Sequence, residues 1–157
     1  MIIRVVSDLD ECARLWRLVE GEQTLFQLWE VRACFQAEFA HRPHFVVAEE
    51  QGRVVGLLPL SWIAELSAYT VFPGELWQGK TWLERNRVWA EDESILLALF
   101  AALDGPSLLR YLEPDSIPAG SEHAVEDEIG YLFHPPRFDF SFAAYQATFP
   151  GKTLRKF

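Results

Sequence analysis

The chain has 157 residues, is 50% hydrophobic with six tryptophans and twelve phenylalanines, and carries a formal charge of −9 at pH 7. This length and composition predict one folded domain and exclude an intrinsically disordered chain. The acidic charge argues against broad contact with nucleic acid or anionic membranes, because both require a basic surface.

The first part of the chain predicts one strand followed by two helices. IIRVV at 2–6 indicates a short strand, and Ser7 with Asp10 fits a capping pattern at the start of a helix. A second helix is predicted from Thr24, with Gln27 in the capping-box position. The apolar positions expected to face the core are Leu9, Cys12, Ala13 and Trp16 in the first helix and Leu28, Val31, Phe35 and Phe39 in the second.

The middle of the chain predicts a β-hairpin. Two apolar runs within 44–62 are joined by a polar turn that contains Gly52, and the second run is apolar on both faces, as in a central strand. A third sheet strand is predicted within 66–74, where Pro73 and Gly74 end it.

The rest of the chain predicts further helices and strands. A buried helix within 93–106 ends at Asp104, Gly105 and Pro106. The segments that follow are predicted as a strand at 107–112, an exposed acidic loop at 113–127, a strand at 128–134 and a last helix at 140–149. The fold class is therefore α/β (α+β).

Features of the termini and the cysteines predict a cytoplasmic protein that does not enter a membrane. Acidic residues interrupt the N-terminal segment where a signal peptide needs an apolar run, and the longest apolar run, ILLALFAAL, is too short to span a bilayer. Cys12 and Cys34 have no partner histidines at metal spacing, so both are expected to be buried free thiols.

The stretch GELWQGKT, Gly74 to Thr81, matches the phosphate-loop pattern G-x-x-x-x-G-K-S/T. Such a loop wraps backbone N–H groups around phosphates, with Lys80 reaching them and the Thr81 hydroxyl binding magnesium. The bulky residues between the two glycines oppose this interpretation, and Glu75 would bring negative charge toward the phosphate. A structural turn is favoured, with a tryptophan held in a groove, and nucleotide binding ranks third among the functional hypotheses.

A set of segments in a fixed order resembles the GNAT acyltransferase superfamily, and within it the FemAB-like and CelD-like proteins. The order strand, two helices and hairpin is that of the opening of this fold. The matching segments are VVAEEQGRVVGLLPL, YTVFPGELW, WLERNR and GKTLRKF. The resemblance extends over most of residues 1–157 and implies a GNAT-like central mixed, largely antiparallel sheet flanked by helices.

The resemblance also implies transfer of an acyl or aminoacyl group to a small-molecule or peptide amine. The donor would be a thioester such as acetyl-CoA or a charged tRNA, the one nucleic acid expected as a partner. The acyl-CoA loop of the superfamily usually reads Q/R-x-x-G-x-G/A, whereas here a single glycine follows Gln78. The candidate cofactor-binding residues in this incomplete motif are Gln78, Gly79 and Lys80.

FemAB-like proteins carry two such domains in tandem. The resemblance implies that residues 1–157 form a single domain, the N-terminal half of a longer protein, which holds the acceptor side of the cleft. The missing second GNAT domain of the same chain would then be its partner and would bind the donor.

Candidate substrate-binding residues follow the third predicted strand, where open α/β sheets place ligands. They combine aromatic surface with polar groups and are Trp77, Trp82, Glu84, Asn86 and Arg87. A solvated turn beneath packed tryptophans is the alternative. No residue is assigned as a catalytic base. No metal site is assigned either, because His41 and His44 have no further ligands that the sequence places near them. Lys152, Arg155 and Lys156 either contact a tRNA or phosphate or begin a solvated helix.

Two classes of function remain open from the sequence. The first is an acyl or aminoacyl transferase domain of the GNAT and FemAB-like kind. The second is a non-catalytic binding or assembly module with a degenerate GNAT fold, which the incomplete acyl-CoA motif favours.

Overall fold

The computed structural model describes residues 1–19, 24–77, 80–126 and 134–150. The chain divides into two compact units, Met1–Ala124 and Val125–Phe157. The first unit contains a sheet with helices on both faces. The second contains two short helical segments.

The sheet is antiparallel throughout its named strands. The strands run in the order β1-β2-β3-β4. Strand β5 pairs with the same edge of β3 as β4 does, at Gly56 and Leu57, which precede the residues of β3 that pair with β4. Their bounds are β1 Ile2–Val6, β2 Arg42–Glu50, β3 Arg53–Ile63, β4 Ala68–Val71 and β5 Trp89–Ala90. The predicted fold class, a largely antiparallel sheet flanked by helices, is confirmed.

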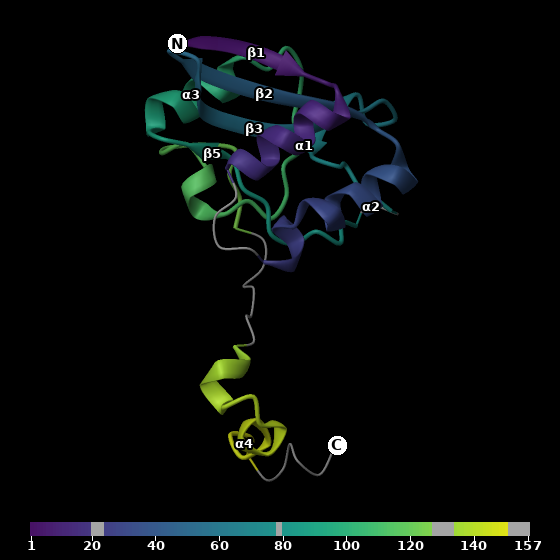
Figure 1. The fold of residues 1–157 in the computed structure, drawn as a ribbon, viewed down its shortest axis with the longest axis vertical. Coiled ribbons are helices and arrows are strands. Elements are labelled where there is room, and N and C mark those ends of the chain that lie inside the picture. The colour runs from purple at the N-terminus through teal and green to yellow at the C-terminus, as the bar shows by residue number, and fades with distance from the viewer. Residues whose placement is uncertain (20–23, 78–79, 127–133, 151–157) are drawn as a thin grey trace. The chain divides into compact units, whose positions relative to one another are not determined.

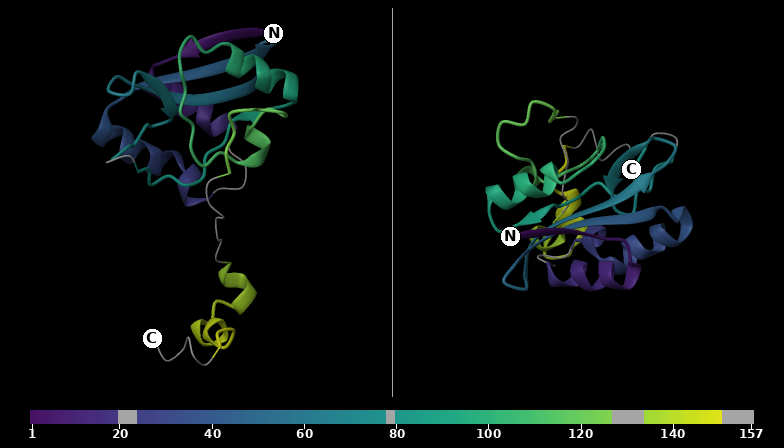
Figure 2. Two further views of the ribbon diagram at one scale, coloured as in Figure 1. Left: turned by 180° about the vertical axis from the view of Figure 1, so that it is seen from behind. Right: turned by 90° about the horizontal axis from the view of Figure 1, so that it is seen from above.

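Helices cover both faces of this sheet (Figures 1 and 2). In the first unit these are α1 Leu9–Leu18, α2 Trp29–Phe39 and α3 Glu93–Ala101, with the short 3-10 helices η1 Leu25–Gln27 and η2 Pro114–Ser116. Helices α1 and α2 lie on one face and α3 lies on the other. The second unit contains η3 Pro135–Phe138 and α4 Phe142–Gln146.

The predicted hairpin is formed by β2 and β3. Its two-residue turn places Gln51 at φ 50° and Gly52 at φ 76°. Two successive residues with positive φ give the turn a twist that matches the twist of the flanking strands. Because residues of β3 are buried on both faces, the prediction of a central strand is also confirmed.

The core consists of two layers of buried side chains, one on each face of the sheet. The layer beneath α1 and α2 includes the aromatic residues Trp16, Trp29, Phe45 and Phe72. The rings of Trp29 and Phe72 stack with centroids 5.5 Å apart. The layer beneath α3 is mostly aliphatic and includes Val46, Ala48, Leu58, Leu60, Ile95 and Leu99.

The N-cap of helix α1 is Asp8, one residue later than the predicted cap at Ser7. The carboxylate of Asp8, rather than Ser7, accepts a hydrogen bond from the N–H of Glu11 at 2.9 Å. Cys12, Ala13 and Trp16 are buried as predicted. Leu9 is 42% exposed, because it lies in the first turn beyond the covered face.

The predicted apolar face of the second helix is wrong. The cap is partly as predicted, because the N–H of Thr24 donates to Oε1 of Gln27 at 3.3 Å, but it opens η1 and not α2. The buried residues of α2 are Trp29, Arg32 and Gln36. Leu28, Val31, Phe35 and Phe39 are only partly buried, and Cys34 is exposed, contrary to its predicted burial. Two polar side chains take the core positions because backbone carbonyls accept their hydrogen bonds.

Helix α3 confirms the predicted helix of this region, and Asp92 caps it by accepting from the N–H of Ile95 at 3.0 Å. The strand predicted at 107–112 is wrong, since this segment makes only isolated bridges with Tyr69 and Asn86. Residues 117–126 are mostly exposed, in agreement with the predicted loop, although Ser116 is buried. The strand predicted at 128–134 falls almost entirely outside the described residues.

The second unit has a small aromatic cluster. Tyr145 packs edge-on against Phe138 and Phe149, with ring centroids 5.1 and 4.9 Å apart. The hydroxyl of Ser141 caps α4 by accepting from the N–H of Ala144 at 3.2 Å. The terminal helix is therefore confirmed, in a shorter form than predicted.

Candidate functional site

A cleft lies between β4 and segment 107–112, where this segment separates from the edge of β4. The segment 107–112 begins parallel to this strand, because the N–H of Tyr69 donates to the Pro106 carbonyl and the N–H of Leu108 donates to the Tyr69 carbonyl, both at 2.8 Å. The segment then leaves β4 and next bridges to Asn86, whose N–H donates to the Tyr111 carbonyl at 2.9 Å. The two chain segments therefore meet at Tyr69 and separate beyond it.

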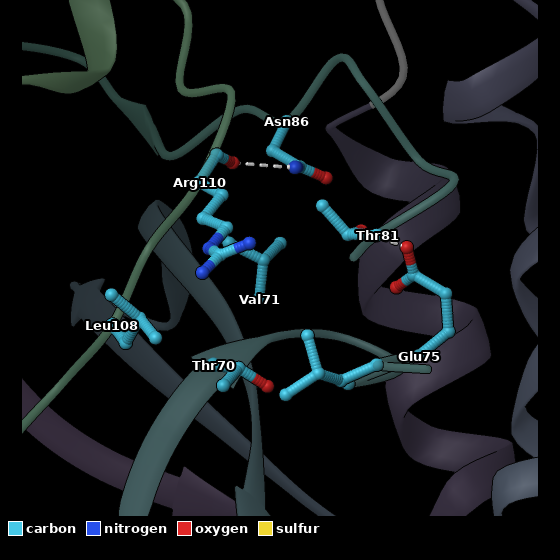
Figure 3. Close-up of a pocket in the computed structure, with 9 residues that line it drawn as sticks. Thr70, Val71, Glu75, Thr81, Asn86, Leu108 and Arg110 are labelled. Atoms are coloured by element: carbon cyan, nitrogen blue, oxygen red, sulfur yellow. Dashed lines mark hydrogen bonds between the residues drawn. The ribbon is translucent and has the colours of Figure 1, made fainter. Parts of the chain in front are cut away.

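The cleft between these segments has an interior volume of about 30 Å³ and opens to solvent. Its lining residues, shown in Figure 3, are Thr70, Val71, Gly74, Glu75, Leu76, Thr81, Asn86, Leu108 and Arg110. Alternate N–H groups of a strand point to the same side. Because the N–H of Tyr69 points away from β3, that of Val71 is directed toward the cleft. The cleft therefore offers part of an open strand edge.

A buried arginine holds the inner wall of the cleft in place through hydrogen bonds. Arg32 is 1% exposed, and it donates from Nε to the Phe26 carbonyl at 2.6 Å and from Nη2 to the Arg85 carbonyl at 3.0 Å. Its Nη1 donates to the Phe72 carbonyl at 2.7 Å and to Oδ1 of Asn86 at 2.8 Å. One guanidinium thus connects α2 to the end of β4 and to the loop that carries Asn86.

Burial lowers the pKa of Arg32 to about 10, and the negative charge of Glu75 partly opposes this shift. The guanidinium carbon lies 5.2 Å from the centroid of the Trp16 ring, so the cation is also held over an aromatic face. At neutral pH Arg32 is therefore a buried cation.

Asn86 is the polar centre of the loop between β4 and β5. Its side-chain amide donates to the Leu83 carbonyl at 3.0 Å and to the Arg110 carbonyl at 2.7 Å, and the latter bond is drawn in Figure 3. Since Oδ1 accepts from Arg32, the amide is satisfied on both its nitrogen and its oxygen. Its role is to fix the wall of the cleft.

Glu75 forms the opposite side of the cleft and is 4% exposed. Its Oε1 accepts from the Thr81 hydroxyl and from the N–H groups of Trp82 and Leu83, the latter two at 2.9 Å. These donors follow directly on the phosphate-loop pattern. The carboxylate therefore receives the N–H groups and the hydroxyl that would otherwise be available to a bound anion.

The geometry of Gly74 to Thr81 differs from that of a phosphate loop. Trp77 and Lys80 instead exchange backbone hydrogen bonds of 2.9 and 3.0 Å. In the described chain, residues 81–88 contain no helix, so no helix N-terminus follows the loop. Lys80 is exposed, while Gln78 and Gly79 lie outside the described residues.

The predicted substrate-binding residues do not converge. Trp77 and Trp82 are 60% and 58% exposed, so neither tryptophan is held in a groove. Glu84 is exposed, whereas Asn86 lines the cleft. Arg87 lies 3.9 Å from a carboxylate oxygen of Glu113 and 3.7 Å from Asp115, outside the lining of the cleft.

Three residues of the site, Arg32, Arg110 and Glu75, are not among those predicted from the sequence. A weak sequence signal existed for Arg32, because it occupies a helix position between the apolar residues Trp29 and Phe35. Arg110 lay in a segment predicted as a strand, and Glu75 was considered only as an obstacle to phosphate.

A second group of polar and aromatic residues lies at the start of β4. The Tyr69 hydroxyl donates to a carboxylate oxygen of Asp104 at 2.6 Å, and the rings of His44 and Tyr69 have centroids 4.4 Å apart. Burial lowers the pKa of His44 despite the nearby Asp104 charge. No group of three or more His, Cys, Asp or Glu side chains suited to a metal occurs among the described residues.

No helix in the described ranges combines the length and apolar character needed to cross a bilayer. Comparison with known proteins gives no match to a family model, to a curated protein or to a solved structure.

Proposed function

We propose that this chain is an acyl or aminoacyl transferase domain of the GNAT and FemAB-like kind, which binds the donor itself instead of leaving it to a second domain and acts on an amine at the cleft beside β4. The observation that carries the proposal is the separation of segment 107–112 from β4 beyond Tyr69. It leaves part of a strand edge open beside a cleft, where an extended ligand containing amide groups can form backbone hydrogen bonds.

The order of elements supports the same proposal. A strand, two helices and three successive antiparallel strands occur in the order on which the resemblance rests. Arg110 lines the cleft and can attract the anionic part of a donor or acceptor. In the proposed reaction, the amine nitrogen bonds to the acyl carbon, the bond to the donor sulfur or oxygen breaks, and the amine proton leaves to a base or water.

The chemistry of the cysteines fits a reducing compartment. Cys12 and Cys34 are both free thiols. A cytoplasmic location is therefore part of the proposal.

The proposal is tested by calorimetric titration of the chain with acetyl-CoA, and separately with pantetheine and with magnesium ATP. We expect binding of acetyl-CoA or pantetheine that is retained in Lys80→Ala and lost in Leu108→Trp, because the larger ring fills the cleft. Leu97→Trp is the matched control, since Leu97 is 50% exposed on α3 whereas Leu108 is 44% exposed at the cleft.

Three results would contradict the proposal. These are absence of acetyl-CoA and pantetheine binding, equal loss of binding in both tryptophan variants, and magnesium ATP binding that depends on Lys80.

One observation favours the alternative of a non-catalytic binding module. Glu75 receives the backbone N–H groups of Trp82 and Leu83, and no helix begins there to bind a pyrophosphate. A module of this kind would bind an amide-containing ligand at the β4 edge without transferring an acyl group. Incubation with acetyl-CoA and a mixture of peptide amines, followed by mass spectrometry of the amines, separates the two functions.

A further inference from the structure

The carboxylate of Glu75 is held by one of its two oxygens. The three donors at residues 81–83 all bind Oε1. In Figure 3 one carboxylate oxygen lies against Thr81 and the other points into the cleft. A nearly buried negative charge is therefore fixed in position with one acceptor oxygen directed at the ligand space.

A hydroxyl group without a hydrogen-bond partner among the described residues lines the same cleft, and a second one lies next to it on β3. Thr70 lines the cleft, and its Oγ1 is buried and has no partner among the described residues. Ser61 lies directly opposite Thr70 in the β3–β4 ladder, is fully buried, and also has no partner for its hydroxyl in the described part of the chain. Buried polar atoms without partners in a native protein commonly mark a site for water or for a polar ligand group.

The glycine at position 74 brings these groups together. Gly74 has φ 77°, and a methyl group at its Cα would lie 3.0 Å from the Thr70 hydroxyl oxygen and 3.2 Å from Cβ of Ser61. A side chain at residue 74 would crowd the Thr70 hydroxyl and Ser61, so the glycine allows the turn that carries Glu75 to lie close against these two residues.

We propose that this end of the cleft binds a primary ammonium group, with Glu75 as its counter-charge and Thr70 as a second hydrogen-bond acceptor. A cavity needs roughly 10–15 Å³ of interior volume to hold a water molecule, so the whole cleft, with about 30 Å³, has room for an ammonium head group. A single carboxylate with hydroxyl acceptors suits a monovalent ammonium, whereas calcium requires six to eight oxygen ligands.

The charges near the cleft are mixed, since Arg110 lines it and the charge of Glu75 acts on the buried cation Arg32. The chain as a whole carries −9, which raises the local concentration of cations near it. Arg110 lies elsewhere in the lining of the cleft, so the ammonium group must face Glu75 and extend its carbon chain toward the opening. The proposal rests on the proposed function only for the statement that this amine is the acyl acceptor.

The test is an NMR titration of the whole chain with n-butylammonium, compared with n-butanol as the neutral ligand of the same carbon chain. We expect saturable shifts of the backbone amides of Val71, Glu75 and Thr81 with n-butylammonium and none with n-butanol. In Glu75→Gln the affinity should fall by about tenfold or more, the loss expected for a hydrogen bond to a charged group.

The substitution Glu75→Gln separates charge from structure. The glutamine Oε1 can still accept from residues 81–83, so the turn is retained while the negative charge is lost. The matched control is Glu65→Gln, which removes an equal charge from an exposed position outside the lining of the cleft and should leave the affinity unchanged. Thr70→Val, a change of similar shape, should weaken binding by removing the second acceptor.

The possible outcomes are distinct from those of the transferase test. Equal shifts with n-butanol, or unchanged affinity in Glu75→Gln, would overturn the ammonium site. Ammonium binding without acetyl-CoA or pantetheine binding would leave the site intact and refute the transferase. The reverse result would leave the transferase and refute the ammonium site.

Discussion

Arg32 and Asn86, 54 residues apart in the sequence, are joined by a hydrogen bond of 2.8 Å from the guanidinium Nη1 to the side-chain oxygen. Through it, α2 is tied to the loop that builds one wall of the cleft. The same guanidinium also holds the end of β4.

We expect Arg32→Lys to lower the free energy of unfolding by about 2–4 kcal/mol, because an ammonium group cannot reproduce the planar fork of donors and leaves carbonyls unpaired. Urea denaturation measures the change. Arg14→Lys is the control, since the Arg14 side chain is 71% exposed and its ion pair with Glu11 is weak. A loss in Arg32→Lys no larger than that in Arg14→Lys would show that the buried fork contributes little.

The two cysteines should differ in reactivity. Burial raises the pKa of Cys12 to about 12, with smaller contributions from Asp8 and Glu11, whereas Cys34 is exposed. The thiolate is the reactive form. We therefore expect one rapidly reacting thiol with a disulfide reagent in mildly alkaline buffer, and no rapid reaction in Cys34→Ser. Rapid labelling that persists in Cys34→Ser would mean that Cys12 is accessible.

Stability should decline at high pH through Tyr69. Burial and the hydrogen bond to Asp104 raise the pKa of Tyr69 from 10.0 to about 12. As the pH rises, the Tyr69 hydroxyl loses its proton in the unfolded chain before it does so in the folded chain. The stabilisation of the fold by Tyr69 is therefore complete below about pH 10 and is lost as the pH approaches 12. Urea midpoints of the native chain and of Tyr69→Phe should converge across this interval. A constant difference between them would contradict the shift.

Gly56 should not tolerate a side chain. A methyl group there would lie 2.6 Å from Cγ2 of Ile95 and 3.0 Å from Cδ1 of Leu99, where α3 packs on β3. We expect Gly56→Ala to cost roughly 1–3 kcal/mol of unfolding free energy, as overpacked cores do. Gly105→Ala is the matched control, because its closest contact would be 3.5 Å. Equal thermal midpoints for the two variants would indicate that α3 shifts without cost.

The sequence predicted elements whose signals are local. The hairpin turn with Gly52 and the apolar helix within 93–106 depend on residues close in the chain, and their apolar runs are unambiguous. The predicted buried face of the second helix is wrong because Arg32 and Gln36 can be buried only where backbone carbonyls accept their hydrogen bonds. Only the folded chain brings these carbonyls close. Polar residues at core positions are exceptions that periodicity does not detect.

The candidate site was less predictable than the fold. The predicted residues follow a strand end and combine aromatic surface with polar groups, but of these Asn86 lines the cleft, whereas Trp77 and Trp82 are exposed. Glu75 and Arg110 reach the cleft from segments 35 residues apart, which no local pattern connects. The phosphate-loop interpretation, which ranked below a structural turn, would place a ligand on residues that hydrogen-bond with one another.

Pro59 of β3 explains why the carbonyl of Phe72 is free to receive Arg32. The N–H of Phe72 donates to the Pro59 carbonyl at 3.0 Å, and in an antiparallel ladder residue 59 would return a bond to the Phe72 carbonyl. Proline has no N–H, so Nη1 of Arg32 takes that acceptor at 2.7 Å. The imino acid and the guanidinium thus complement one another, and in related chains we expect positions 32 and 59 to vary together.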